Sequence, residues 1–174
     1  MTLLVAATER ELCGLEGLVC GIGPVEAAAA TARALAQVRR SAVVHVGIAG
    51  ARGIAPGTIV LGAEAVYCDA TWDGVPRRVL PDHALLEAAR AVFPDAPVLA
   101  IGTSARVGGT PPELEVEAME GFAVLRAASL AGVPAVEVRA VSNEVAEPDR
   151  AQWRFDEALA ALAAAIPRLL SALA

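Results

Sequence analysis

The chain has 174 residues, and its 20 acidic and 14 basic side chains give a formal net charge of −6. This acidic balance argues against a nucleic-acid partner, because binding phosphate groups needs a basic face. The sequence is 56% apolar and rich in alanine, yet no apolar run approaches the roughly 20 residues of a membrane span.

The length predicts one domain spanning residues 1–174. Its three cysteines, Cys13, Cys20 and Cys68, are unevenly spaced, form no metal-ligand pattern and suit a reducing compartment. We therefore expect a cytoplasmic protein with no metal, no cofactor and no membrane segment.

The first part of the chain alternates short apolar segments with an alanine-rich one. Residues 2–7 and 18–21 predict two short strands, and Pro24 begins a predicted helix that extends to about Val38. Residues 42–46 predict a third strand. We expect this strand to end in a small-residue turn at Gly47–Gly50, where backbone can approach a ligand closely.

The middle of the chain continues the alternation of strands and helices. The predicted elements are a strand from Pro56-Gly57 through Tyr67, a polar loop from Thr71 to Pro81, a helix from Asp82 to Phe93, a strand from Val98 to Ile101 and a loop at Gly108–Pro112. This order predicts a mostly parallel sheet covered by helices on both faces.

The segment from Met119 to Asn143 combines two structural elements with polar ends. Met119-Glu120 opens a predicted helix, which Gly132-Val133-Pro134 stops, and a Val-rich strand from Ala135 to Val141 ends in Ser142-Asn143. Open α/β sheets bind ligands at the carboxyl ends of their strands, so we expect a site here. A last helix is predicted by the apolar stripe of Leu159, Leu162, Ile166, Leu169 and Leu173.

The motifs of this segment are shared with a known group of enzymes. The run MEGFAVLRAASLAGVPAVEVRAVSN resembles the signature of the purine nucleoside phosphorylase and nucleosidase superfamily, in which Met-Glu at a helix start precedes an Arg-Ala-(Ile/Val)-Ser-(Asp/Asn) strand end. Within that superfamily, VEAMEG and SNEVAEPDRAQW are most similar to futalosine hydrolases. The resemblance implies an α/β fold, a single-domain three-layer α/β/α sandwich with a mostly parallel, mixed central sheet.

The same resemblance implies an activity and a partner. The expected reaction is hydrolysis of the N-glycosidic bond of futalosine, which releases hypoxanthine in the alternative menaquinone route. The relatives are homo-oligomers in which a neighbouring subunit closes the pocket, so a dimer or tetramer is expected.

Two carboxylates are expected to carry the chemistry, because such a reaction must activate a water and hold an oxocarbenium-like ribose. By the resemblance, Glu11 in the run Ala-Thr-Glu-Arg-Glu-Leu is the water-activating base, with Glu9 as the competing carboxylate. Glu120 is the expected clamp on the ribose hydroxyls, with Met119 packing on the sugar face. Ala118 separates Glu117 from Met119, so Glu117 lies one residue earlier than in the usual Glu-Met-Glu pattern. Futalosine hydrolases show a similar insertion.

Asn143 is the expected determinant of base specificity. Methylthioadenosine nucleosidases have Asp at this position, whereas Asn can donate to O6 of a 6-oxopurine and accept from a protonated N7. A mismatched polar group costs roughly 1–3 kcal/mol, enough to select hypoxanthine over adenine by one or two powers of ten. Asn cannot supply the proton for N7, so that proton must come from water or another group.

The remaining site residues are expected around the substrate. Trp153 is the expected stacking wall, with Phe155 as the alternative, and Ala49 and Gly50 would offer backbone close to the base or sugar. Two residues inside strands are expected to be structural: Arg139 as a buried support, and His45, for which the spacing suggests no partner.

Three other functions remain open. A methylthioadenosine/adenosylhomocysteine nucleosidase is opposed by Asn143. A purine nucleoside phosphorylase would need a phosphate cradle, to which Arg52, Ser104 and Arg106 could contribute. A non-catalytic nucleoside-binding protein is suggested by the shortness of the segment Leu12–Gly17, where relatives have a hairpin.

Overall fold

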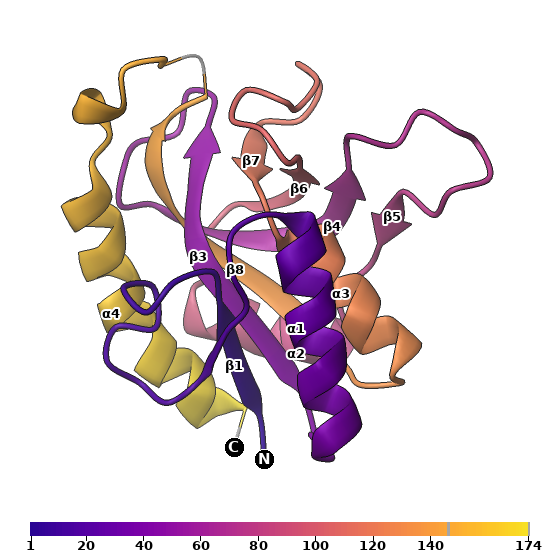
Figure 1. The fold of residues 1–174 in the computed structure, drawn as a ribbon. Coiled ribbons are helices and arrows are strands. Elements are labelled where there is room, and N and C mark those ends of the chain that lie inside the picture. The colour runs from indigo at the N-terminus through magenta and orange to yellow at the C-terminus, as the bar shows by residue number, and fades with distance from the viewer. Residues whose placement is uncertain (146, 174) are drawn as a thin grey trace.

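The computed structural model describes residues 1–145 and 147–173. Its strands are β1 (Leu3–Ala6), β2 (Leu18–Val19), β3 (Val43–Ala51), β4 (Ile59–Tyr67), β5 (Arg78–Val79), β6 (Val98–Thr103), β7 (Val116–Ala118) and β8 (Ala135–Glu144). Its helices are α1 (Pro24–Gln37), α2 (His83–Val92), α3 (Gly121–Leu130) and α4 (Phe155–Ala172), with a short 3₁₀ helix at Arg150–Gln152 (Figure 1).

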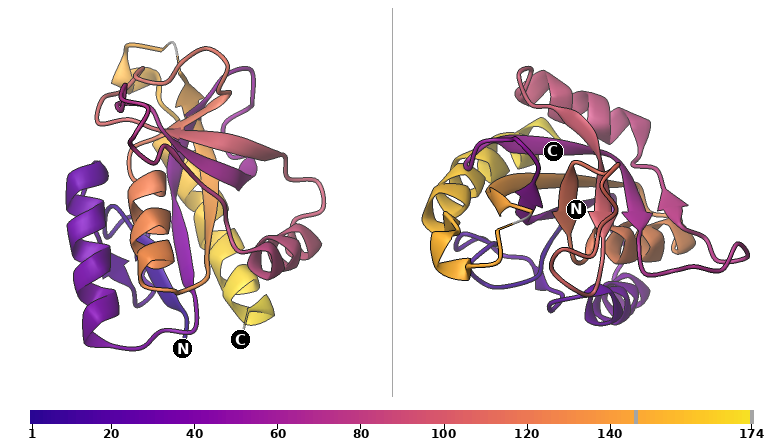
Figure 2. Two further views of the ribbon diagram at one scale, coloured as in Figure 1. Left: turned by 90° about the vertical axis from the view of Figure 1, so that its right-hand side faces the viewer. Right: turned by 90° about the horizontal axis from the view of Figure 1, so that it is seen from above.

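The molecule has three layers, with the sheet between two pairs of helices (Figure 2). Helices α1 and α3 cover one face, where Ala27 and Leu125 pack against Val5 and Val43 of the sheet. Helices α2 and α4 cover the other, where Phe93 and Leu162 belong to a second apolar cluster. The predicted three-layer α/β/α architecture is confirmed, and its helices at 24–38 and 82–93 lie within one residue of their predicted bounds at either end.

Five strands of the sheet pair into a closed ring, in the order β3, β8, β4, β6, β7 and back to β3. The pairs β3–β8, β4–β6 and β6–β7 are parallel, whereas β4–β8 and β3–β7 are antiparallel, so the sheet is mixed. Small and β-branched side chains fill the ring: Ala49, Ala51, Val60, Ile101, Val116, Ala118 and Val141. Because the ring closes, the ends of β3, β7 and β8 meet at one place.

The turn predicted at Gly47–Gly50 is wrong, because β3 continues through it to Ala51. The small residues serve close strand packing instead. Gly50 pairs with Glu117 of β7 on one side and, beyond a register shift at Ala49/Gly50, with Asn143 of β8 on the other.

Two strands were not predicted. The polar loop expected at residues 71–81 contains β5, and the segment before Met119 contains β7. Both are two or three residues long and exist through pairing with distant strands, so local patterns do not reveal them.

Helix α3 begins immediately after the Met-Glu motif, with Glu120 as its N-cap residue. The amide of Phe122 donates a 2.8 Å hydrogen bond to the Thr103 hydroxyl, which satisfies one free donor of the first turn. Strand β8 extends past the predicted Val141 and includes Ser142 and Asn143. Among the described residues, no helix combines the length and apolar character needed to cross a membrane.

Candidate active site

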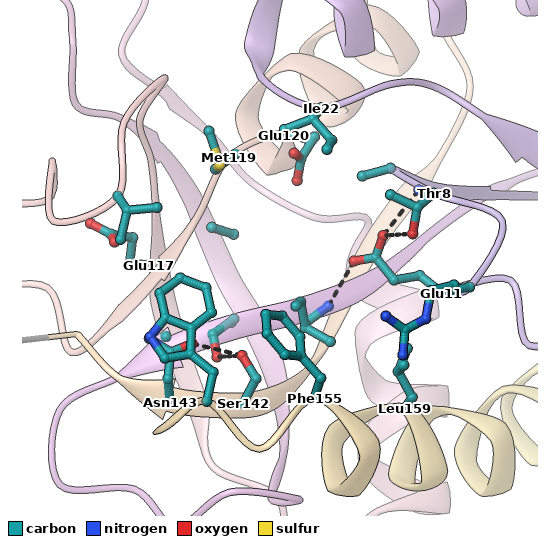
Figure 3. A pocket seen from close by; sticks show the side chains of 18 of the residues that line it. Thr8, Glu11, Ile22, Glu117, Met119, Glu120, Ser142, Asn143, Phe155 and Leu159 are labelled. Carbon is teal, nitrogen blue, oxygen red and sulfur yellow. Dashed lines mark hydrogen bonds between the residues drawn. The ribbon is translucent and has the colours of Figure 1, made fainter. Parts of the chain in front are cut away.

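A cavity of about 240 Å³ lies where the ends of β3, β7 and β8 meet, beside the loop that follows β1 (Figure 3). All seven site residues expected from the sequence line it: Glu11, Ala49, Gly50, Met119, Glu120, Asn143 and Trp153. They come from five separate parts of the chain, so the fold alone brings them together. Glu11 and Asn143 therefore face the same space.

The Glu11 carboxylate is held by the loop after β1 and by β3. Its Oε2 accepts hydrogen bonds from the Thr8 amide (3.0 Å) and hydroxyl (2.7 Å), and its Oε1 accepts one from the Ile48 amide (3.0 Å). A carboxylate has about four acceptor positions, so roughly one remains for a water in the cavity. Glu11 lies in a turn and is buried, whereas Glu9 is exposed and does not line the cavity.

The Glu120 carboxylate is buried at the start of α3, with 4% of the residue exposed. Its Oε1 accepts a hydrogen bond from the Gly23 amide (3.0 Å), and its Oε2 lies 3.6 Å from Nη1 of Arg139. Gly23 has a φ of 91°, a conformation that favours glycine. Burial raises the pKa of the Glu120 carboxyl, and the Arg139 guanidinium opposes that rise.

The Asn143 carboxamide is fixed by its chain neighbours. Its Oδ1 accepts a 2.7 Å hydrogen bond from the Ser142 hydroxyl, and its Nδ2 donates to the Glu144 carbonyl at 3.1 Å. A Cβ atom on Gly50 would lie 3.0 Å from Nδ2, so the glycine leaves room for the amide.

Aromatic side chains form one wall of the cavity. Trp153 and Phe155 both line it, with ring centroids 5.5 Å apart, and Figure 3 shows Phe155 across the cavity from Met119 and Glu120. The Trp153 indole donates to the Glu147 carbonyl (3.3 Å), and the Arg150 guanidinium lies 5.0 Å from its ring centroid. Both expected stacking residues are therefore available to a ligand.

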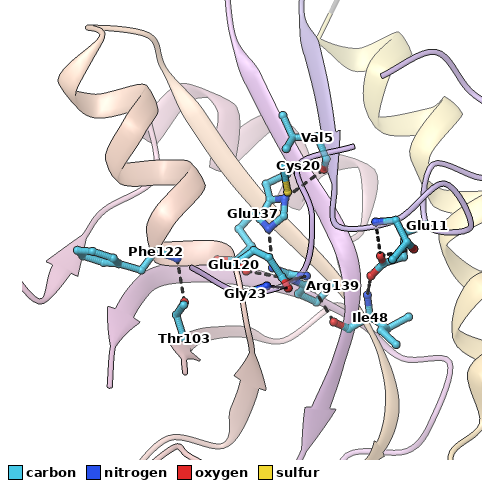
Figure 4. A network of polar contacts seen from close by, with 12 residues as sticks. Val5, Glu11, Cys20, Gly23, Ile48, Thr103, Glu120, Phe122, Glu137 and Arg139 are labelled. Atoms are coloured by element: carbon cyan, nitrogen blue, oxygen red, sulfur yellow. Dashed lines mark hydrogen bonds and ion pairs between the residues drawn. The ribbon is translucent and has the colours of Figure 1, made fainter. Parts of the chain in front are cut away.

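Arg139 does not line the cavity but lies behind it, fully buried (Figure 4). The expectation that His45 has no partner is wrong. Its Nε2 lies 2.6 Å from Arg139 Nη2, and its Nδ1 lies 3.1 Å from the Val5 carbonyl. Burial, and then the charge of Arg139, lower the pKa of His45 well below its usual range, so its ring is neutral.

Sequence reasoning missed Glu137, which pairs with Arg139 Nε at 2.7 Å and is also fully buried. The signal available was a glutamate inside an otherwise apolar strand. The sequence likewise predicted no contacts for Glu117. It lines the cavity and accepts hydrogen bonds from the Gly108 amide (2.6 Å) and from the Thr110 amide (3.0 Å) and hydroxyl (2.9 Å).

Several lining residues had no sequence signal because they are apolar or lie in loops: Thr8, Ile22, Val107 and Leu159. Within the described residues, no group of three or more His, Cys, Asp or Glu side chains is arranged to hold a metal ion.

The fold and the cavity define a class of protein, and the comparisons with known proteins point to the same class, the phosphorylase superfamily. The family model of the phosphorylase superfamily matches residues 17–174. Among solved structures, futalosine hydrolase of Helicobacter pylori has a TM-score of 0.86 at 13% identity, covering 98% of this chain and 97% of that one. The methylthioadenosine/adenosylhomocysteine nucleosidase of Neisseria meningitidis has a TM-score of 0.81 at 24% identity, covering 99% and 97%. These two likenesses concern the fold.

Two curated relatives are closer in sequence. The futalosine hydrolase of Streptomyces coelicolor is 38% identical, covering 90% of this chain and 78% of the relative, and that of Thermus thermophilus is 35% identical, covering 91% and 84%. The chain therefore belongs to the futalosine hydrolase family of the phosphorylase superfamily and is a nucleosidase. The match to the Streptomyces protein spans 188 residues, more than the 174 of this chain, so that relative contains segments that this chain lacks.

Proposed function

We propose that the protein hydrolyses the N-glycosidic bond of futalosine, releasing hypoxanthine and dehypoxanthine futalosine. The observation that carries this proposal is the convergence of Glu11, Glu120 and Asn143 on one cavity in a member of this family. The three side chains offer a base, a ribose clamp and a purine contact.

In the proposed reaction, Glu11 takes a proton from a water as the water oxygen bonds to C1′ of the ribose. The C1′–N9 bond breaks, its electron pair goes to the base, and the base takes up a proton from solvent. Glu11 suits this role because its two oxygens are oriented by Thr8 and Ile48 while one acceptor position stays open.

The buried carboxylates beside the cavity favour the cationic ribose that such a reaction forms. Glu120 and Glu137 share one guanidinium, that of Arg139, and Glu11 lies near it, in a buried region where His45 is uncharged. Electrostatic interactions are strong at low dielectric, and preorganised negative charge stabilises developing positive charge.

The hydrogen bonds of Asn143 support recognition of a 6-oxopurine. With Oδ1 bonded to Ser142 and Nδ2 bonded to the Glu144 carbonyl, the amide retains one N–H donor and one acceptor position. The donor suits O6 of hypoxanthine and the acceptor suits a protonated N7. This pattern opposes the second candidate function, methylthioadenosine/adenosylhomocysteine hydrolysis, because adenine presents a donor at N6.

The contacts of the three residues considered for a phosphate cradle favour water over phosphate as the nucleophile. Arg52 donates to the carbonyls of Leu114 and Thr110, and the Ser104 hydroxyl donates to Asp69. Neither these two residues nor Arg106 lines the cavity. With Glu11 facing the cavity, an anionic nucleophile would also be repelled.

We propose two further properties for this enzyme: a homo-oligomeric state, and a cytoplasmic location. The exposed side chains Ile22 and Val107 at the cavity support closure by a second copy, which light scattering after size-exclusion chromatography would test. All three cysteines are free thiols, which suits a reducing compartment.

The decisive experiment measures release of the free purine base, hypoxanthine or adenine, and its first substrate is futalosine without phosphate. Inosine and methylthioadenosine, each with and without phosphate, serve as parallel substrates. We expect phosphate-independent release from futalosine. Dependence on phosphate would indicate a phosphorylase, preference for methylthioadenosine would indicate the other nucleosidase, and tight binding without base release would indicate a non-catalytic binding protein.

A further inference from the structure

The buried cluster of Glu137, His45 and Arg139 takes no direct part in the proposed proton-transfer and bond-breaking steps; Figure 4 labels Glu137 and Arg139. All three side chains have 0% exposure, and a buried ionic group is costly unless its contacts serve a purpose. The cluster lies behind the cavity, against both proposed active-site carboxylates.

Two neighbours fix one edge of the Arg139 guanidinium. Its Nε donates to Glu137 Oε1 at 2.7 Å, and its Nη2 donates to His45 Nε2 at 2.6 Å. His45 can accept only as a neutral ring with its proton on Nδ1, and that proton is used by the Val5 carbonyl at 3.1 Å. His45 is thus an uncharged acceptor held from both sides.

The opposite edge of the guanidinium faces the active site. Nη1 lies 3.4 Å from the Ile48 carbonyl and 3.6 Å from Glu120 Oε2. A Cβ atom on Gly47 would overlap with this nitrogen and lie 2.8 Å from Glu11 Oε1, so guanidinium and carboxylate flank the same point above Gly47. The positive charge therefore sits between Glu11 and Glu120.

Glu137 also supports the residue that follows Glu120. A Cβ atom on Gly121 would overlap with the Glu137 carboxylate, so this carboxylate lies directly against the first turn of α3. Within the described residues, Glu137 Oε2 has no hydrogen-bond donor. Such an orphan oxygen costs stability, which suggests that the position of Glu137 serves Arg139 and not its own hydrogen bonding.

We propose that Glu137 and His45 are positioning residues that hold the Arg139 guanidinium between Glu11 and Glu120. Held there, the guanidinium keeps Glu120 ionised and able to accept hydrogen bonds from the ribose. The other groups facing it are Glu11 and the Cys20 thiol, whose pKa burial raises to about 12, so Cys20 stays neutral. The kinetic part of this inference rests on the proposed function.

The test is a pair of His45 variants, neither of which changes the charge of the cluster. His45→Leu removes the acceptor for Nη2, whereas His45→Gln retains an acceptor and a donor. In His45→Leu we expect a roughly tenfold higher KM and an acid limb of kcat/KM moved up by about one pH unit, because the Arg139 guanidinium is no longer held beside Glu120. His45→Gln should restore most of both values.

The matched control is Thr31→Val, which replaces another fully buried polar side chain away from the cavity and should leave KM and the acid limb unchanged. If folded His45→Leu keeps the KM and the acid limb of the unmodified enzyme, the proposal is wrong. If His45→Leu does not fold, Glu137→Gln carries the test, and an unchanged KM there would equally overturn it.

A second readout does not depend on turnover. The Glu120 carboxyl can be titrated by ¹³C NMR on glutamate-labelled protein, with its resonance assigned by its loss in Glu120→Gln. We expect its pKa to rise in His45→Leu and to return in His45→Gln, and a constant pKa would overturn the proposal. Absence of futalosine hydrolysis by the unmodified protein would instead refute the proposed function, while this titration would still test the positioning role.

Discussion

Nδ2 of Asn143 donates a 3.1 Å hydrogen bond to the Glu144 carbonyl, and because a carbonyl only accepts, this bond decides which end of the carboxamide is nitrogen. Oδ1, at the other end, lies 2.7 Å from the Ser142 hydroxyl, which can donate to it or to the Ala49 carbonyl at 3.2 Å. An amide can be turned by 180° at little cost unless such partners orient it. The face that Asn143 presents to the cavity, which we propose recognises the purine, is therefore set by its two neighbours in β8, Ser142 and Glu144.

The first prediction concerns this orientation. Asn143→Asp should shift the ratio of kcat/KM towards adenine nucleosides by one or two powers of ten, since a mismatched polar group costs roughly 1–3 kcal/mol. Competing assays with inosine and adenosine measure the ratio. Ser142→Ala, which leaves Asn143 in place but removes one of the two groups that contact its amide, should weaken discrimination without reversing it. An unchanged ratio in Asn143→Asp would refute the role of this residue.

The second prediction concerns Glu11, the proposed water-activating base. Glu11→Gln should lower kcat by about 10²–10⁴-fold while nucleoside binding persists, because the side chain keeps its shape but cannot take a proton. The control is Glu9→Gln, whose exposed carboxylate lies outside the cavity and should be dispensable. Full activity of Glu11→Gln would exclude Glu11 as the water-activating base. A large loss of activity in Glu9→Gln would indicate that Glu9 is the base instead.

The third prediction concerns the space above Gly47. Gly47→Ala should displace Arg139 or Glu11, lowering stability by roughly 1–3 kcal/mol and reducing activity more than unfolding explains. The matched control is Gly74→Ala, where the nearest atoms belong to the exposed Trp72 ring, which can move. Urea denaturation and steady-state kinetics on both variants make the comparison. An active, stable Gly47→Ala would contradict the close approach.

The fourth prediction concerns pH. Burial raises the pKa of Glu120 above the ordinary glutamate value of 4.5, so kcat/KM should fall on the acid side at a pH above that value. The stability of the folded protein should change with pH in the opposite direction. The folded protein binds a proton at Glu120 and at Glu137 more tightly than the unfolded chain does. The stabilisation from these two carboxyl groups is therefore present below pH 4.5 and is lost as pH rises through their raised pKa values. Activity profiles and urea titrations over a pH series would check both directions.

The fifth prediction uses the scarcity of aromatic residues. The chain has two tryptophans, and Trp72 is 75% exposed, away from the cavity, whereas Trp153 lines it. In Trp72→Phe, hypoxanthine should therefore quench the remaining fluorescence. Trp153→Ala should raise KM about tenfold or more, because stacking on a base contributes roughly 1–3 kcal/mol. If Phe155→Ala has the larger effect on KM, Phe155 is the stacking residue.

Much of the fold follows from local patterns in the sequence. The helices at 24–38 and 82–93, the apolar stripe of the last helix and the Val-rich strand from Ala135 are signals within single segments. The Met119-Glu120 and Ser142-Asn143 motifs are each made of two consecutive residues, so Glu120 and Asn143 could be recognised as site candidates from the sequence.

Other features depend on contacts between distant segments. Strand β7 is three residues long and exists because β3 and β6 flank it, and Gly47–Gly50 continues a strand because β8 pairs with it. Neither pairing leaves a periodic pattern in its own segment.

The amino-acid sequence alone determined the order of the helices and of the strands other than β5 and β7, and the chemical groups at the end of β8 and at the start of α3. Only the tertiary structure decided that His45 and Glu137, on two neighbouring parallel strands, both contact Arg139, and that this guanidinium lies between Glu11 and Glu120. The physical reason is that hydrogen bonds and buried charges act over a few ångströms in space, whatever the separation along the chain.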